Sequence, residues 1–126
     1  MSETQKTTMP IVQMAIDNDE FREVVYTGEK TQVVLMAIPA GGEIGGEVHE
    51  GHDQILIFVE GNGKAKIGET ETEMQAGDLC FVPAGAYHNF TNTGPGPLKL
   101  YTTYSPPEHA PGTEHKTKAE ADAQEA

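Results

Sequence analysis

The sequence is poor in cysteine, in long apolar runs and in basic residues, and each of these absences excludes a class of protein. Its 126 residues include one cysteine, Cys80, so an internal disulfide is excluded and a reducing cytoplasm is the expected location. No apolar run approaches the roughly 18 residues that a membrane-spanning helix needs. The polar beginning, MSETQKTTMP, has no apolar segment of the kind that secretory signals carry. We therefore expect a cytoplasmic protein without a membrane partner.

Basic residues are also scarce. Eight lysines and arginines stand against 20 aspartates and glutamates, which gives a formal net charge of −12. A surface this acidic repels phosphate backbones, so nucleic-acid binding is not expected. Because Arg22 is the only arginine, we expect the ligand to be a small molecule such as a neutral sugar or a metal chelate rather than a nucleotide.

Glycine and proline, in contrast, are plentiful and recur at short intervals. Fourteen glycines and eight prolines separate short β-prone runs, several of which alternate polar and apolar residues. Many short strands between Gly/Pro turns are typical of an all-β sandwich or barrel. We predict strands at 32–38, 53–60, 63–68, 71–75, 78–83, 88–93 and 98–105, after a first strand at Ile11–Ala15.

The length predicts a single domain with one core. The C-terminal segment, residues 109–126, has no large apolar residue after Pro111. We therefore expect this segment to bury little surface and to leave His109 and His115 exposed to solvent. The predicted organisation is an N-terminal segment with the first strands (1–30), a barrel (31–108) and a tail that is helical or disordered (109–126).

The most informative stretch is GDLCFVPAGAYHNFTN, residues 77–92. It predicts a strand, a tight turn at the sequence PAG and a second strand that His88 opens. A histidine in this position is expected to point into the barrel rather than at solvent. His88 is therefore a candidate metal ligand, and the chain must be searched for others.

Further candidates come from residues 41–61. Glu47 and His49 are two residues apart, so on a strand their side chains share one face. On the next strand, Gln54 shares one face with Leu56 and Phe58. Together with His88 they would offer two imidazoles, one carboxylate and one amide oxygen. That set suits a divalent transition metal ion such as Fe, Mn, Ni, Co or Zn.

The two stretches resemble the motifs of the cupin family. The second cupin motif, G-x5-P-x-G-x2-H-x3-N, is filled at every position by Gly77, Pro83, Gly85, His88 and Asn92. The first, G-x5-H-x-H-x3–4-E-x6-G, fits the spacing from Gly41 to Gly61, with Glu47 replacing its first histidine and Gln54 its glutamate. The resemblance implies a double-stranded β-helix, or jelly roll, with Glu47, His49, Gln54 and His88 around a metal site. It also implies a homodimer, formed by exchange of N-terminal strands within residues 9–38.

Two alternatives to this ligand set remain open. His52, three residues beyond His49, is a rival ligand that would have to swing inward from a turn. In a metal-free barrel, Glu47 and Gln54 would instead form internal hydrogen bonds, and His49 would be a satisfied core histidine.

Three functions fit these residues. A metal-dependent enzyme would bind a small oxygenated substrate, such as an enol, an α-keto acid or a sugar, with the ion as Lewis acid and Glu47 as a general base. Isomerase, lyase or cyclase chemistry is favoured, and with Fe(II) a dioxygenase is the other choice. The alternatives are a non-catalytic module that binds a small ligand and a metal-free structural barrel.

Overall fold

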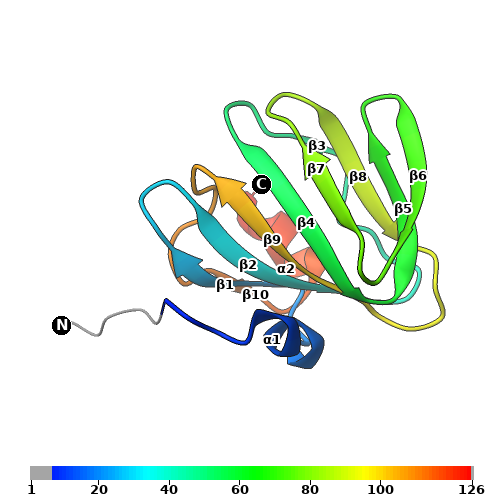
Figure 1. Ribbon diagram of the computed structural model, residues 1–126, viewed down its shortest axis with the longest axis horizontal. Coiled ribbons are helices and arrows are strands. Elements are labelled where there is room, and N and C mark those ends of the chain that lie inside the picture. The colour runs from blue at the N-terminus through cyan, green and yellow to red at the C-terminus, as the bar shows by residue number, and fades with distance from the viewer. Residues whose placement is uncertain (1–6, 126) are drawn as a thin grey trace.

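Two antiparallel sheets face each other and enclose the core (Figure 1). The computed structural model describes residues 7–125. One sheet has six strands in the order β10-β1-β2-β9-β4-β7, and the other has four in the order β3-β8-β5-β6. The elements are α1 (Ile11–Asp17), β1 (Arg22–Thr27), β2 (Gln32–Ile38), β3 (Glu47–Val48), β4 (Asp53–Glu60), β5 (Asn62–Ile67), β6 (Thr70–Gln75), β7 (Leu79–Val82), β8 (Tyr87–Asn92), β9 (Leu98–Ser105), β10 (Glu114–His115) and α2 (Lys118–Glu125).

The predicted all-β jelly roll is confirmed, and its central strands have the predicted bounds. β2, β4 and β9 coincide with the predicted runs at 32–38, 53–60 and 98–105. On β4 the side chains of Gln54, Leu56 and Phe58 are buried, whereas those between them are partly exposed. This alternation is the period of a strand with one face on the core. It places the amide of Gln54 inside the barrel.

The core joins the two sheets through aromatic and aliphatic side chains. Phe58 on β4 and Phe90 on β8 are almost fully buried, and their ring centroids are 5.9 Å apart. An aromatic pair of this kind contributes about 0.5–1.5 kcal/mol beyond its buried area. Val34, Met36 and Ile38 from β2, Leu56 from β4, and Leu98 and Leu100 from β9 complete the centre of the cluster.

Gly61 shows why the first motif ends in glycine. Its φ of 93° lies in the region that favours glycine, and a Cβ at this position would stand 2.5 Å from the carbonyl oxygen of Pro97. The residue lets the chain turn from β4 into β5 close beside the loop that leads into β9. The fold therefore requires a residue without a side chain at this corner.

The predicted first strand at Ile11–Ala15 is wrong, because this segment forms the helix α1. Ile11, Met14 and Ala15 follow the helical spacing i, i+3, i+4, and Ala15 is fully buried. The helix packs against the outer face of β9, β2 and β4, and Figure 1 shows it below the front sheet. The first strand of the structure is β1, which lies within the predicted N-terminal segment 1–30 but was not among the predicted strand ranges.

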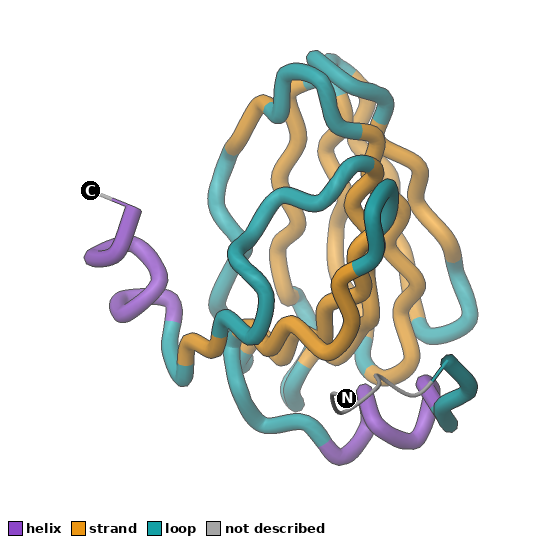
Figure 2. The backbone as a smooth tube through the Cα atoms, turned by 90° about the vertical axis from the view of Figure 1, so that its left-hand side faces the viewer, coloured by secondary structure: helices purple, strands orange, loops and turns teal. Residues whose placement is uncertain are grey.

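The C-terminal part is more ordered and more buried than predicted. The predicted exposure of His115 is wrong: it lies on β10, is 2% exposed and pairs across the strands with Arg22. The ring Nδ1 of His115 is 3.2 Å from a guanidinium nitrogen of Arg22. Ala121 on α2 is also buried, and Figure 2 shows α2 beyond the end of this short strand. Within the tail, residues 118–125 form the helix α2.

Among the described residues, no helix has the length and apolar character required to cross a membrane.

Candidate metal centre

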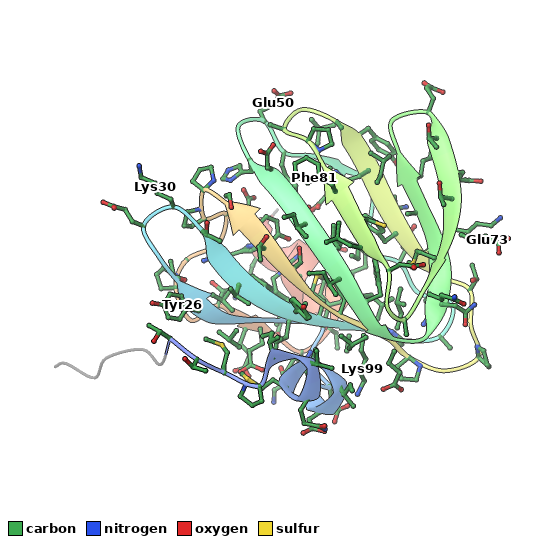
Figure 3. All side chains as sticks on the ribbon, viewed as in Figure 1. Tyr26, Lys30, Glu50, Glu73, Phe81 and Lys99 are labelled. Carbon is green, nitrogen blue, oxygen red and sulfur yellow. The ribbon has the colours of Figure 1, made fainter. Side chains whose placement is uncertain are left out.

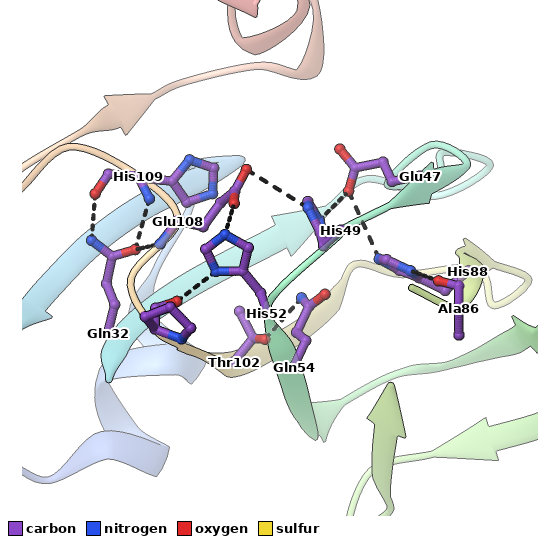
Figure 4. Close-up of polar contacts among 11 residues, drawn as sticks. Gln32, Glu47, His49, His52, Gln54, Ala86, His88, Thr102, Glu108 and His109 are labelled. Carbon is purple, nitrogen blue, oxygen red and sulfur yellow. Dashed lines mark hydrogen bonds and ion pairs between the residues drawn. The ribbon is translucent and has the colours of Figure 1, made fainter. Parts of the chain in front are cut away.

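Three side chains with metal-binding atoms meet at one end of the four-stranded sheet. Glu47 on β3 lies directly opposite His88 on β8, and His49 follows β3 two residues later on the same side. One oxygen of Glu47 and one ring nitrogen from each histidine all lie within 4.8 Å of one another (Figure 4). The pairing of β3 with β8 thus brings the two motifs into contact.

His88 presents a free nitrogen to this group. The side chain is 1% exposed, and its Nδ1 lies 3.1 Å from the carbonyl oxygen of Ala86. Because a carbonyl can only accept, Nδ1 carries the proton and Nε2 keeps its lone pair. This Nε2 is buried, has no hydrogen-bond partner among the described residues and lies 3.9 Å from Oε1 of Glu47. Burial lowers the pKa of His88, which favours the neutral ring that metal binding requires.

Glu47 is held as a carboxylate. Burial raises the pKa of its carboxyl, but the hydrogen bond and charge of His49, with smaller effects of His88 and Arg22, outweigh burial, so that the pKa lies below its usual value. Oε1 accepts a hydrogen bond from Nε2 of His49 at 3.0 Å. An ionised carboxylate between two imidazoles is a good cation ligand and a weak base.

Gln54 enters from the other sheet. Its Nε2 donates to the hydroxyl oxygen of Thr102 at 3.0 Å, and that hydroxyl donates to the carbonyl of Ile55 at 2.8 Å. The amide is therefore oriented, and its oxygen is left buried without a hydrogen-bond partner among the described residues. Buried polar atoms normally have partners. The unpartnered oxygen of Gln54 and nitrogen of His88 are thus two atoms that an ion or a ligand would satisfy.

His52, the rival ligand, points away from the group. Its Nδ1 lies 2.7 Å from the carbonyl oxygen of Pro106, and its Nε2 lies 3.0 Å from Oε1 of Glu108. Both ring nitrogens therefore face the segment after β9 rather than Glu47. Sequence reasoning missed Glu108, for which the only signal was its place beside a histidine in the run PPEHAP.

His109 lies one ring away from the group instead of in solvent. Its ring meets that of Tyr104 at a centroid distance of 5.2 Å, and Tyr104 meets His49 at 5.7 Å. Burial lowers the pKa of His109 to about 4, with the charge of Arg22 as the next cause, so the ring is neutral near pH 7. The predicted exposure of His109 is therefore wrong, since the segment after β9 folds back over the barrel.

Comparison with known proteins decides the family. Residues 34–104 match the family described as Cupin domain, and this range contains Glu47, His49, Gln54 and His88. The chain belongs to the cupin family. Of these four motif positions, Glu47, His49 and His88 are the ones whose ligand atoms the structure brings together.

Two bacterial relatives are similar to this cupin over most of its length. The crystal structure of BH2720 from Bacillus halodurans is 38% identical, covers 97% of each chain and superposes with a TM-score of 0.93. The uncharacterized protein YrkC of Bacillus subtilis is 42% identical over 114 residues, which are 86% of this cupin and 61% of YrkC. The cupin therefore spans less than two thirds of that relative.

A more distant similarity concerns a named ligand. An oxalate-binding protein of Thermotoga maritima is 34% identical over 59 residues, which are 47% of this cupin and 49% of the relative. A crystal structure of a predicted oxalate decarboxylase from Thermotoga maritima is 26% identical and superposes with a TM-score of 0.60 over 63% of this cupin.

Proposed function

We propose that this cupin binds one divalent transition metal ion through Glu47, His49 and His88, with the oxygen of Gln54 as a further donor. The observation that carries the proposal is the buried, unpartnered Nε2 of His88, which faces Glu47 and lies in a group of ligand atoms within 4.8 Å. One carboxylate and two neutral imidazoles suit Fe, Mn, Co, Ni or Zn. A purely structural role for His88 would leave its buried Nε2 without a hydrogen-bond partner among the described residues.

The ligand that we propose for this site is a small molecule with two oxygen donors. When bound, the ion supplies Lewis-acid stabilisation of negative charge on the ligand. The chain itself contributes side chains that keep donors oriented: Ala86 sets the tautomer of His88, and Thr102 sets the amide of Gln54. The similarity to an oxalate-binding protein supports a small carboxylate such as oxalate as a candidate, beside enols, α-keto acids and sugars.

The lowered pKa of Glu47 favours its role as a ligand over that of a general base. A general base works best when its pKa lies near the working pH. The neighbouring histidines instead stabilise the carboxylate of Glu47, which makes it a poorer proton acceptor. Isomerase, lyase or cyclase chemistry would then need a base from the substrate or solvent, and a binding module without turnover is the alternative function.

The test is metal content followed by ligand binding. Protein purified without chelator is expected to contain about one transition metal ion per chain by elemental analysis. Calorimetry should then show oxalate binding to the metal-loaded protein and none to protein stripped with EDTA, and a product assay separates enzyme from binder. Absence of metal, and no uptake of Mn, Fe, Co, Ni or Zn by the stripped protein, would contradict the proposal.

We also propose that a second copy of the chain covers the part of the outer face of the six-stranded sheet that β4 and β7 form. On this face β4 and β7 present a cluster without charge, and Leu79 and Phe81 are 58% and 49% exposed. Figure 3 labels Phe81 on β7, at the front of the molecule. Because each chain has a net charge of −12, two copies approach with least repulsion where the surface is uncharged. The cluster consists of Ile55, Ile57, Leu79 and Phe81.

A charge in this cluster should separate the copies. We expect the wild-type protein to be a dimer and Phe81→Asp to be a monomer when their masses are measured by light scattering after size exclusion. Tyr87→Asp is the matched control, since Tyr87 is 42% exposed but lies on the other sheet. A monomeric wild type, or a dimer that survives Phe81→Asp, would refute this assembly.

A further inference from the structure

The segment that follows β9 carries a carboxylate to the metal-binding histidine. Glu108 lies between two imidazoles: its Oε1 is 3.0 Å from Nε2 of His52, and its Oε2 is 3.7 Å from Nδ1 of His49. Neither cupin motif includes Glu108, which is 59 residues from His49 in the sequence. Figure 4 shows it on the opposite side of the His49 ring from Glu47.

Hydrogen bonds to Gln32 hold the backbone at Glu108 and His109, so Glu108 is not a freely moving surface residue. The backbone N–H groups of Glu108 and His109 both donate to Oε1 of Gln32, at 3.1 and 3.0 Å. The amide nitrogen of Gln32 donates in turn to the carbonyl oxygen of His109 at 2.7 Å. Gln32 lies on β2 and is fully buried, so its amide ties the segment to the barrel wall.

His52 contacts the carboxylate of Glu108 directly. Its ring spans the gap between the carbonyl oxygen of Pro106 and Oε1 of Glu108, at 2.7 and 3.0 Å. This leaves Oε2 of Glu108 as the oxygen nearer to His49. The side chain of Glu108 is 28% exposed, so its charge is only partly screened by water.

The chemistry of His49 gives this contact a role. In the metal-free protein Nε2 of His49 donates its proton to Glu47. If an ion were bound beside Glu47 and His88, Nε2 of His49 would be its ligand atom, because Nε2 is the nitrogen that faces Glu47. The single proton of the neutral ring would then be on Nδ1, which faces Glu108. A carboxylate near the second nitrogen favours this tautomer and makes the imidazole a stronger ligand.

We propose that Glu108 is a positioning residue of the metal centre, which holds the proton of metal-bound His49 on Nδ1 and keeps its Nε2 directed at Glu47 and His88. At 3.7 Å it acts through its charge rather than through a short hydrogen bond. The proposal rests on the metal-binding function proposed above. The proposed role of Glu108 gives the C-terminal segment a function. It also explains why His52 faces this segment rather than Glu47, His49 and His88.

The test uses Glu108→Gln, which keeps the shape of the side chain and removes its charge. The dissociation constant for Zn(II) or Mn(II) should rise about 10–100-fold, as is typical when a partner of a metal-ligating histidine is lost. Glu73→Gln is the matched control, since it makes the same change in net charge on the exposed face of β6 and should alter the constant less than about twofold.

A second measurement reads the ring of His49 directly. In the zinc-loaded protein, nitrogen-15 NMR should show the ring proton of His49 on Nδ1, and that proton should exchange with solvent faster in Glu108→Gln than in the wild type, while Glu108→Asp retains slow exchange. An unchanged exchange rate in Glu108→Gln overturns the proposal, as does a changed rate with unaltered metal affinity. If the wild type binds no Zn(II), the proposed metal-binding function fails. If the wild type binds Zn(II) and Glu108→Gln changes neither measurement, only the role of Glu108 fails.

Discussion

Replacing His88 with alanine is expected to abolish the metal binding proposed for this cupin. His88 is the most buried of the three proposed ligands, and its Nε2 has no hydrogen-bond partner among the described residues that could explain its position. Loss of a direct ligand should weaken binding at least about 100-fold, because loss of an outer partner alone costs 10–100-fold. Elemental analysis and calorimetric titration with Zn(II) measure this directly.

Thermal or urea unfolding gives an independent readout of the same change. A ligand that binds only the folded state stabilises it by about 2.7 kcal/mol at 100 times its dissociation constant. Excess Zn(II) should therefore stabilise the wild type and leave His88→Ala unchanged. His115→Gln is the control, since His115 is also a buried histidine but lies on β10, outside the ligand group. Equal stabilisation of wild type and His88→Ala would disprove the assignment of this ligand.

Asn92→Ala is expected to cause a large loss of stability without changing the ligand group of the candidate metal centre. The side chain of Asn92 is 3% exposed and forms three hydrogen bonds. Its Nδ2 donates to the carbonyl oxygens of Ile38 and Gly96, at 3.0 and 2.9 Å, and its Oδ1 accepts from the N–H of Gly94 at 2.9 Å. Truncation orphans these backbone groups at the corner where β8 ends, and we expect the free energy of unfolding to fall by about 2–4 kcal/mol.

Urea denaturation at equilibrium measures this loss. Asn62→Ala is the matched control, because Asn62 is exposed and its amide makes only a long bond of 3.4 Å to Thr93. It should change the free energy of unfolding by no more than about 0.5 kcal/mol. If both variants lose the same stability, the asparagine that closes the second motif has no special structural role.

Local patterns in the sequence predicted much of the fold. Alternation along 32–38, 53–60 and 98–105 marked which side chains face the core, and glycines and prolines marked the turns between strands. Where two periods competed, the sequence was misleading. In the run from Ile11 to Ala15 the helical spacing of three apolar residues prevailed, because that face packs against the outside of the sheet.

The candidate site was predictable in its parts but not in its arrangement. Motif spacing identified Glu47, His49 and His88 as candidate metal ligands, and the structure brings these three side chains together. It does not place His52 with them, because Pro106 and Glu108 occupy both nitrogens of that ring. No local pattern could show this, since the contacts depend on where a distant segment returns.

By itself the sequence determined the strand faces, the turns, the family resemblance and the residue types that can bind a metal ion. These follow from side-chain alternation and backbone preference, which act between near neighbours in the chain. Only the tertiary structure decided that Gln32 anchors Glu108 and His109 across 76 and 77 residues, and that Glu108 faces His49. Such contacts are set by the pairing of distant strands, which close the barrel and bring its C-terminal segment back over the histidines.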